Sequence, residues 1–273
     1  MIARTMQTAT ADENDSASAL RFGVADLHLH TDAGDGMSSA RDVLDRVERA
    51  TELDVIAITD HDDIAGALAA REVHTRGEYH FAFVPGIEVT TRAGHLLALW
   101  VDEPIASLRP LDETIAAIHR AGGMAVIPHP FSYLTRSVGQ RALERLLRDG
   151  DAETRPDGIE VANPSLAGRV TRAKAQRLNR ERYRIAEIGG SDAHFIEEVG
   201  VARTLFGGTT SADLRASIEQ GATRGLIRDP VPLQAIGARR LLRQQVRGLS
   251  VTPRKVLARP LRRLAGALRG GRR

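Results

Sequence analysis

The chain alternates between short apolar runs and longer amphipathic stretches from residue 21 to residue 229. The apolar runs have the length and composition of buried strands, and we predict strands at residues 21–28, 54–59, 81–89, 95–101, 124–127, 158–162, 185–188 and 204–206. Apolar residues at helical spacing predict helices at residues 39–52, 64–77, 111–122, 139–148, 168–180 and 211–220. Repeated strand-then-helix units predict an α/β fold with a mainly parallel sheet or barrel.

Two segments of different composition flank this region. Residues 1–20 are polar and lack an apolar core, so we expect a flexible N-terminal segment and not a secretory signal. From residue 230 onward there are 12 basic residues and no acid, whereas residues 1–229 carry 26 basic and 35 acidic residues. We therefore expect one acidic globular domain at residues 21–229 and a basic, partly helical tail at residues 230–273.

The tail has the pattern of an amphipathic helix. Leu257, Leu261, Leu264 and Leu268 recur at helical spacing, with arginines between them. Such a helix could make weak contact with an anionic membrane or with nucleic acid phosphates. The alternative is that it packs on the acidic domain or stays disordered. The lack of aromatic residues after Phe206 argues against both a membrane anchor and base stacking.

Composition narrows the chemistry. The chain has no cysteine, which excludes disulfides, thiolate metal sites and cysteine nucleophiles. Any metal must then be held by imidazole and carboxylate groups, which suit manganese, iron or zinc. No uncharged apolar stretch reaches about 18 residues, so no ordinary membrane span is predicted, and we expect a cytoplasmic protein.

Six of the nine histidines follow or open predicted strands beside acids, glycines or prolines. His28 and His30 are two apart, so both imidazoles lie on one side of an extended strand. Strand ends in an α/β fold meet at one edge, which favours a multi-metal site there. The remaining histidines, His74, His80 and His119, fall within or beside helices and are interpreted as surface or packed residues. The candidate ligands are His28, His30, Asp35, His61, Glu88, His95, His129, Asp192 and His194.

The order of these motifs resembles the polymerase and histidinol phosphatase (PHP) superfamily of metal-dependent phosphoesterases. The resemblance covers about residues 22–206. It rests on Asp-Leu-His-Leu-His-Thr, Ile-Thr-Asp-His-Asp, Pro-Gly-Ile-Glu, Gly-His, His-Pro and Gly-Gly-Ser-Asp-Ala-His, in that order. It implies a distorted (β/α)7 barrel at residues 21–229, with a three-metal centre at the C-terminal ends of the strands.

The resemblance also implies how the ligands are shared. One metal would be held by His28, His30 and Asp192, and Glu88 would bridge it to a second metal. The second metal would be held by His95 and His129, and the third by Asp35, His61 and His194. Two features depart from the family pattern. Gly34 stands where a serine often precedes the aspartate, and only 33 residues separate the motifs at His95 and His129, where some nucleotide-acting relatives carry a long insertion.

The function implied is hydrolysis of a phosphomonoester or phosphodiester, in a small phosphorylated metabolite or at a nucleotide or oligonucleotide end. Two or three divalent ions would supply a metal-bound hydroxide as nucleophile, with no catalytic side chain beyond it. The absence of a Gly-x-Ser-x-Gly elbow agrees with this expectation. Two alternatives stay open: a metal-dependent hydrolase of a carboxylic ester or amide, and a non-catalytic metal-binding interaction module.

Groups around the metals are predicted from position alone. Asp60 or Asp62 could orient an imidazole, although Asp62 could equally cap the helix that begins near residue 64. Asn163 is either a turn residue before a proline or a hydrogen-bond partner of substrate. Arg136 and Arg169 follow strand ends and are candidates for binding phosphate. Because the chain has 36 arginines, a solvated surface role is the competing interpretation for both.

Overall fold

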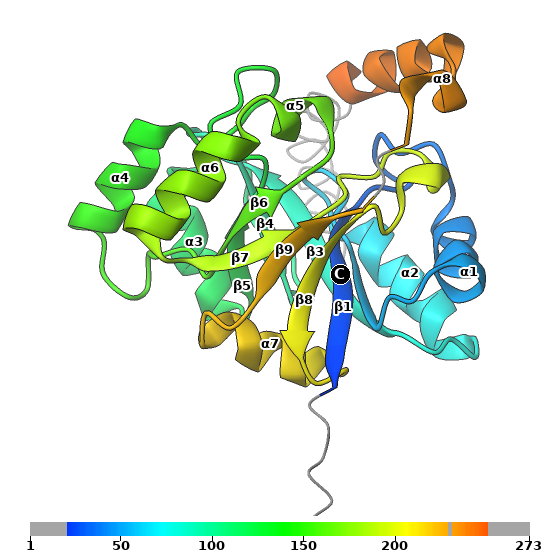
Figure 1. Ribbon diagram of the computed structural model, residues 1–273, viewed down its shortest axis with the longest axis horizontal. Coiled ribbons are helices and arrows are strands. Elements are labelled where there is room, and N and C mark those ends of the chain that lie inside the picture. Colours follow the sequence, from blue (N-terminus) through cyan, green and yellow to red (C-terminus); the bar gives the residue numbers. More distant parts are fainter. Residues whose placement is uncertain (1–20, 229–230, 251–273) are drawn as a thin grey trace, which may run out of the picture.

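The computed structural model describes residues 21–228 and 231–250, which form a nine-stranded sheet with helices packed around it (Figure 1). The strands lie in the order β7-β6-β5-β4-β3-β2-β1-β8-β9. They are β1 Phe22–Leu29, β2 Val55–Ile58, β3 Ala82–Thr90, β4 His95–Leu99, β5 Met124–Ile127, β6 Gly158–Ala162, β7 Ala186–Gly189, β8 Ala202–Gly207 and β9 Arg224–Ile227. The α-helices are α1 Ala40–Ala50, α2 Ala65–Arg76, α3 Leu111–Arg120, α4 Gln140–Asp149, α5 Leu166–Arg169, α6 Arg172–Leu178, α7 Ser211–Glu219 and α8 Leu233–Ile236.

Strand direction agrees with the prediction of a mainly parallel barrel, except that β4 and β8 run opposite to the other strands of the described residues. Strands β1 to β3 are parallel, and so are β5 to β7, but β4 runs antiparallel to both β3 and β5. Strand β8 is likewise antiparallel to β1 and to β9. Residues 91–94 alone connect β3 to β4, and so short a connection allows a hairpin but no parallel crossover. Strand β4 therefore begins at the edge where β3 ends.

Close backbone approaches bring the two ends of the sheet together. The Gly189 amide donates to Thr204 Oγ1 at 3.0 Å, and a Cβ added at Gly189 would lie 2.1 Å from the Arg203 carbonyl oxygen. A Cβ added at Gly225 would lie 2.7 Å from the Ile188 carbonyl oxygen. These positions tolerate only glycine, because a side chain would separate the strands. The sheet is nearly closed, which confirms the predicted α/β barrel, with nine strands in place of seven.

One local prediction was wrong, and one strand was not predicted. Residues 168–180 do not form one helix, because α5 and α6 are separated near Thr171, and a π-helix at Asn179–Tyr183 follows. The Thr171 hydroxyl donates to the Pro130 carbonyl at 2.7 Å, which ties this break to another loop. Strand β9 was not predicted, since four residues containing an arginine and a glycine do not have the pattern of a buried strand.

Residues 238–250 are helical and lie above the edge of the sheet where β1 ends (Figure 1). None of the helices among residues 21–228 and 231–250 is long and apolar enough to cross a membrane. The predicted N-terminal segment at residues 1–20 and the predicted amphipathic helix from Leu257 to Leu268 lie outside the described residues.

Barrel closure can be tested at two glycines. We expect Gly189→Ala to lower the free energy of unfolding by about 2 kcal/mol or more, because the new methyl group would overlap the backbone of β8. Gly207→Ala is the matched control, since nothing lies within 4 Å of a Cβ added there. Urea denaturation of both variants measures the difference. Equal stability of the two would contradict the close approach of β7 and β8.

Candidate metal centre

The nine candidate ligands converge at one edge of the barrel, although they come from seven places in the chain. The parallel strands deliver their ligands near their C-terminal ends, and β4 delivers His95 at its first residue because it runs the other way. Seven of the nine side chains are buried, and His61 and His194 are partly exposed. The fold thus brings the whole predicted set together, while the role of each residue as a ligand stays a prediction.

Glu88 lies at the centre of this cluster. Its Oε1 atom is 2.8 Å from His95 Nδ1 and 3.1 Å from His129 Nε2. Its Oε2 atom faces three other imidazole nitrogens at 3.2 to 3.3 Å, which belong to His28, His30 and His61. One carboxylate therefore faces two histidine groups with its two oxygens, as a bridging ligand must.

Asp35 organises a second group beside it. Asp35 Oδ2 is 3.2 Å from His194 Nε2 and 3.8 Å from His61 Nε2. Asp35 Oδ1 is 3.6 Å from His30 Nδ1. These four residues offer ligand atoms that all lie within 4.8 Å of one another. The expected set of Asp35, His61 and His194 is thus close together, and His30 lies near enough to join it.

Asp192 faces the pair of histidines from β1. Its Oδ1 atom is 3.3 Å from His30 Nε2 and 3.5 Å from His28 Nε2. Asp192 has a φ of 54° and His129 a φ of 29°, which lie in a region that residues with side chains rarely adopt. Such conformations persist where the surrounding structure imposes them. At His129 one constraint is its amide, which donates to Glu160 Oε2 at 2.8 Å.

Three imidazoles are oriented by hydrogen bonds on the side away from the cluster. His28 Nδ1 lies 2.9 Å from Glu160 Oε1, and His194 Nδ1 lies 2.9 Å from the Asp192 carbonyl oxygen. Both oxygens are acceptors, so Nδ1–H donates in each pair. His129 Nδ1 is 2.9 Å from Ser137 Oγ. This arrangement fixes the rings and directs Nε2 of each at the cluster, which is the usual arrangement of metal-bound histidine.

The charges of the cluster favour bound cations. Burial by itself would lower the pKa of His30, but the nearby carboxylates of Asp192, Glu88 and Asp35 outweigh it and raise this pKa to about 10. Burial lowers the pKa of His61 to about 4, although Glu88 and Asp35 oppose the shift. The buried carboxylates thus favour a positive charge beside them, as on the His30 imidazole. Protons and metal ions compete for the same ring nitrogen atoms.

Several buried polar atoms here lack a well-aligned partner among the described residues. They include both ring nitrogens of His30, Asp35 Oδ1 and His95 Nδ1. Unpaired buried polar atoms are costly in folded proteins and occur where an ion or water completes the site. The imidazole and carboxylate donors suit manganese, iron or zinc. The residues of the cluster therefore fit divalent metal ions.

The two aspartates that flank His61 hold loops in place. Asp60 accepts hydrogen bonds from the Thr31 amide at 2.7 Å and from the Thr31 hydroxyl at 2.6 Å, which fixes the start of the loop that carries Asp35. Asp62 accepts from the Thr90 amide and hydroxyl, both at 2.8 Å. Helix α2 is capped at residue 64 without a side-chain hydrogen bond, so the alternative that Asp62 caps it is wrong.

The predicted substrate residues occupy the same edge. Asn163 is buried, donates to Glu160 Oε2 at 2.8 Å and accepts from the Ser165 amide at 2.9 Å, which confirms its role in a turn. Arg136 and Arg169 are exposed, and the Arg136 carbonyl accepts from the His95 amide at 2.8 Å. Substrate binding by these three residues stays a prediction.

The three histidines outside the candidate ligand set have hydrogen-bond partners elsewhere. His74 Nε2 lies 2.7 Å from the Phe81 carbonyl oxygen, His80 Nδ1 lies 2.8 Å from Glu48, and His119 Nε2 lies 2.9 Å from Asp157. None of them joins the groups of potential ligands among the described residues.

Sequence reasoning missed Glu160. Its carboxylate accepts from His28, from the His129 amide and from Asn163, so one buried side chain positions two candidate ligands. A signal was present, because Glu160 is the one charged residue in the otherwise apolar strand β6. Ser137 gave no comparable signal, since a serine in a loop is common.

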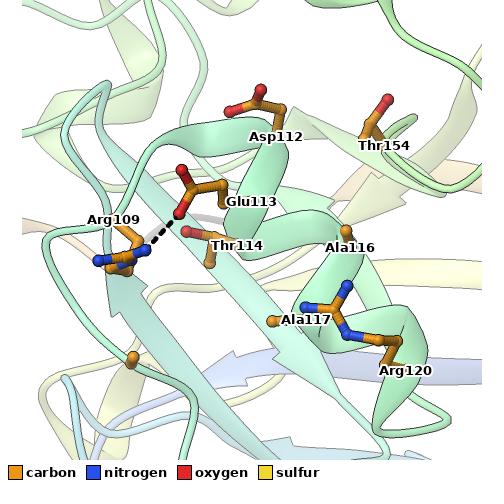
Figure 2. Close-up of a pocket in the computed structure, with 9 residues that line it drawn as sticks. Arg109, Asp112, Glu113, Thr114, Ala116, Ala117, Arg120 and Thr154 are labelled. Carbon is orange, nitrogen blue, oxygen red and sulfur yellow. Dashed lines mark hydrogen bonds and ion pairs between the residues drawn. The ribbon is translucent and has the colours of Figure 1, made fainter.

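A hollow of about 350 Å³ lies along α3 and is lined by residues such as Arg109, Arg120 and Thr154 (Figure 2). The Arg109 guanidinium donates to Glu113 at 2.7 Å within it. No candidate metal ligand lines this hollow, so the chemistry is assigned to the histidine cluster.

Glu160 can be tested as a positioning residue. Both of its oxygens accept hydrogen bonds. In Glu160→Gln the new side-chain NH2 group would therefore face one of the donors that now bind Glu160. We expect metal affinity to fall about 10-fold or more, as for other groups that orient metal-bound histidines. Glu187→Gln on the neighbouring strand β7 is the matched control, because Glu187 is only partly buried. Calorimetric titration with Mn²⁺ measures both, and equal affinities would remove the role assigned to Glu160.

Comparisons with known proteins agree with this architecture. Residues 173–223 match the family model described as PHP-associated. The uncharacterized protein MJ1587 of Methanocaldococcus jannaschii is 31% identical over 150 residues, which are 51% of this chain and 81% of that protein. The 5'-3' exoribonuclease Rnm of Salmonella typhimurium is 41% identical over 70 residues, which are 25% of this chain and 23% of that enzyme.

A solved structure shows the same fold. It is a two-domain protein from Bacteroides vulgatus described as containing a predicted PHP-like metal-dependent phosphoesterase, with a TM-score of 0.63 and 18% sequence identity. The match covers 77% of this chain and 66% of that one. The solved structure shows the fold, and the match to the PHP-associated model, with the order of the motifs, places the chain in the PHP superfamily.

Proposed function

We propose that the protein is a metal-dependent phosphoesterase that hydrolyses a phosphomonoester or phosphodiester. The observation that carries the proposal is the convergence of nine ligand-type side chains around Glu88, whose two oxygens face different histidine groups. Two similarities support the proposal. The Bacteroides vulgatus structure is described as containing a predicted PHP-like metal-dependent phosphoesterase, and the Salmonella relative is an exoribonuclease. The site would hold two or three divalent ions, with manganese, iron and zinc all compatible with these ligands.

Closely spaced divalent ions, when bound, activate water as a nucleophile near neutral pH and neutralise charge on phosphoryl oxygens. The protein's own contribution is orientation. Glu160, Ser137 and the Asp192 carbonyl hold three imidazoles in place, so the ligands need little rearrangement. The chain has no cysteine that could serve as a covalent nucleophile. This donor set suits direct hydrolysis.

The surroundings of the site favour a substrate with an apolar or aromatic part. Tyr133 is 79% exposed and Leu134 49% exposed, both in the loop that follows His129. Leu166, which opens α5 after β6, is 65% exposed. Arg136 is exposed on the same loop as Tyr133. An aromatic ring and a guanidinium near a metal centre suit a base and a phosphate respectively, so we propose a nucleotide or an oligonucleotide end as substrate.

The reaction is tested by phosphate release. Protein reloaded with Mn²⁺ is incubated with nucleotides, sugar phosphates, a chromogenic phosphodiester and a chromogenic carboxylic ester. We expect turnover of one of the phosphate esters, and we expect Glu88→Gln to abolish it while lowering the number of metals per chain in elemental analysis. The physical reason is that an amide is neutral and cannot bridge two cations as a carboxylate does.

The control for this variant is Glu103→Gln, which makes the same change from carboxylate to amide at an exposed loop residue. Circular dichroism checks that both variants are folded. Turnover of the carboxylic ester alone would contradict phosphoester hydrolysis. Full metal content in folded Glu88→Gln would contradict the bridging role of Glu88.

The proposed role of Tyr133 is tested by comparing two substitutions. We expect Tyr133→Ala to raise KM for a nucleotide about 5-fold to 100-fold, which corresponds to loss of one base-stacking contact. Tyr133→Phe keeps the ring and should leave KM nearly unchanged. Because Tyr133 is exposed, neither change should destabilise the fold. Equal KM values for the alanine variant and the unmodified protein would argue against stacking at this residue.

A further inference from the structure

Residues 238–250 form a helical segment that lies over the edge of the barrel where the metal cluster is found (Figure 1). We call this segment the C-terminal strap. One side of it contacts the barrel and includes Arg240, the buried Gln244 and Arg247. The opposite side carries Leu242 and Val246, which are exposed. The strap thus packs on the barrel through polar side chains, which suggests that its contacts are specific.

The first set of contacts holds the loop that carries Asp35. Arg247 Nε donates to the Gly34 carbonyl at 2.9 Å, and Arg247 Nη2 donates to the Asp32 carbonyl. Gln244 Nε2 is 3.5 Å from Asp35 Oδ2, the oxygen that also faces His194. The helix backbone itself comes close, because a Cβ added at Gly248 would lie 3.1 Å from that same oxygen.

The second set of contacts holds the loop that carries His194. The Arg240 guanidinium forms a paired interaction with Glu197, with distances of 2.7 and 3.1 Å. Its Cζ atom also lies 5.1 Å from the centre of the Phe195 ring. Glu197 belongs to the short 3-10 helix Ile196–Glu198, which begins two residues after His194. A bidentate contact of this kind fixes orientation as well as distance.

The two loops are far apart in the chain but contact each other at the metal centre. Asp35 follows β1 and His194 follows β7, and the Met37 amide donates to the His194 carbonyl at 2.8 Å. The strap spans both loops from outside, with Arg247 on one and Arg240 on the other. The loop of Asp35 includes Gly34 and Gly36, so ordering it costs more backbone entropy than ordering other residues.

We propose that the C-terminal strap is a positioning element of the metal centre, in which Arg247, Gln244 and Arg240 hold Asp35 and His194 in the geometry for binding a metal ion. The strap would therefore set the affinity of the group formed by Asp35, His61 and His194, and would have less effect on His28, His95 and His129. This inference rests on the metal binding that the proposed function requires, but it does not depend on which bond is hydrolysed.

The test compares matched arginines on the same helical segment. In the full chain, we expect Arg247→Ala to weaken one Mn²⁺ binding step about 10-fold, the scale for losing a group that orients a metal ligand. Arg243→Ala is the control, because Arg243 is exposed and this substitution removes the same charge four residues before Arg247. Arg247→Lys keeps the charge but cannot donate to both carbonyls in the same geometry, so it should behave more like the alanine variant than like the control.

A second pair tests the other loop. Arg240→Ala removes the contact with Glu197, whereas Arg239→Ala changes its exposed neighbour. Metal content and affinity are measured by elemental analysis and by calorimetric titration with Mn²⁺ alone, so the result does not depend on turnover. A loss of Mn²⁺ affinity that is confined to the Arg247 and Arg240 variants supports the positioning role of the strap. Unchanged binding in both, or an equal loss in the controls, overturns it. If Arg247→Ala does not fold, the Arg240 pair decides.

Discussion

The structure depends on one buried carboxylate. Glu88 is 1% exposed and lies among five imidazole rings, and a negative charge in such a place is costly unless positive charge surrounds it. Coulombic attraction to His61, His95 and His28 outweighs the effect of burial and holds the pKa of Glu88 well below its usual range. The cluster therefore combines fixed negative charge with groups that bind either protons or metal ions. This property makes the edge of the barrel a place for cations.

Strand direction explains how so many ligands reach one carboxylate. In a purely parallel barrel, each strand brings ligands only from its C-terminal end. Here β4 is reversed, so the short connection after β3 places His95 opposite Thr90, two residues from Glu88, and His95 Nδ1 lies 2.8 Å from the Glu88 carboxylate. The hairpin thus adds a ligand without a long crossover.

The ligands are supported by a layer of groups outside them. Glu160 joins His28, the backbone of His129 and Asn163, and it does so from the middle of a buried strand. The C-terminal strap has a comparable position on the other side, over Asp35 and His194. In metal sites such outer groups affect affinity strongly, because they determine where the ligand atoms point. The basic tail therefore has a structural connection to the metal centre through its described part.

The sequence by itself determined the type of fold, most strands and the full set of candidate ligands. Histidines and acids at strand ends are local signals, and apolar periodicity is local as well, so both can be read along the chain. His28 and His30, two residues apart on a strand, are the clearest example.

Only the tertiary structure decided how these pieces meet. The reversal of β4, the closure of β7 on β8 through Gly189, the role of Glu160 and the contact of Arg247 with the Asp35 loop all join residues from different elements. The positive φ of His129 likewise accompanies a contact with another element, because its amide donates to Glu160 on β6. Sequence patterns report which face of an element is buried, but they carry little information about which distant group it is buried against. That choice comes from packing of the whole barrel, and it positions the metal centre.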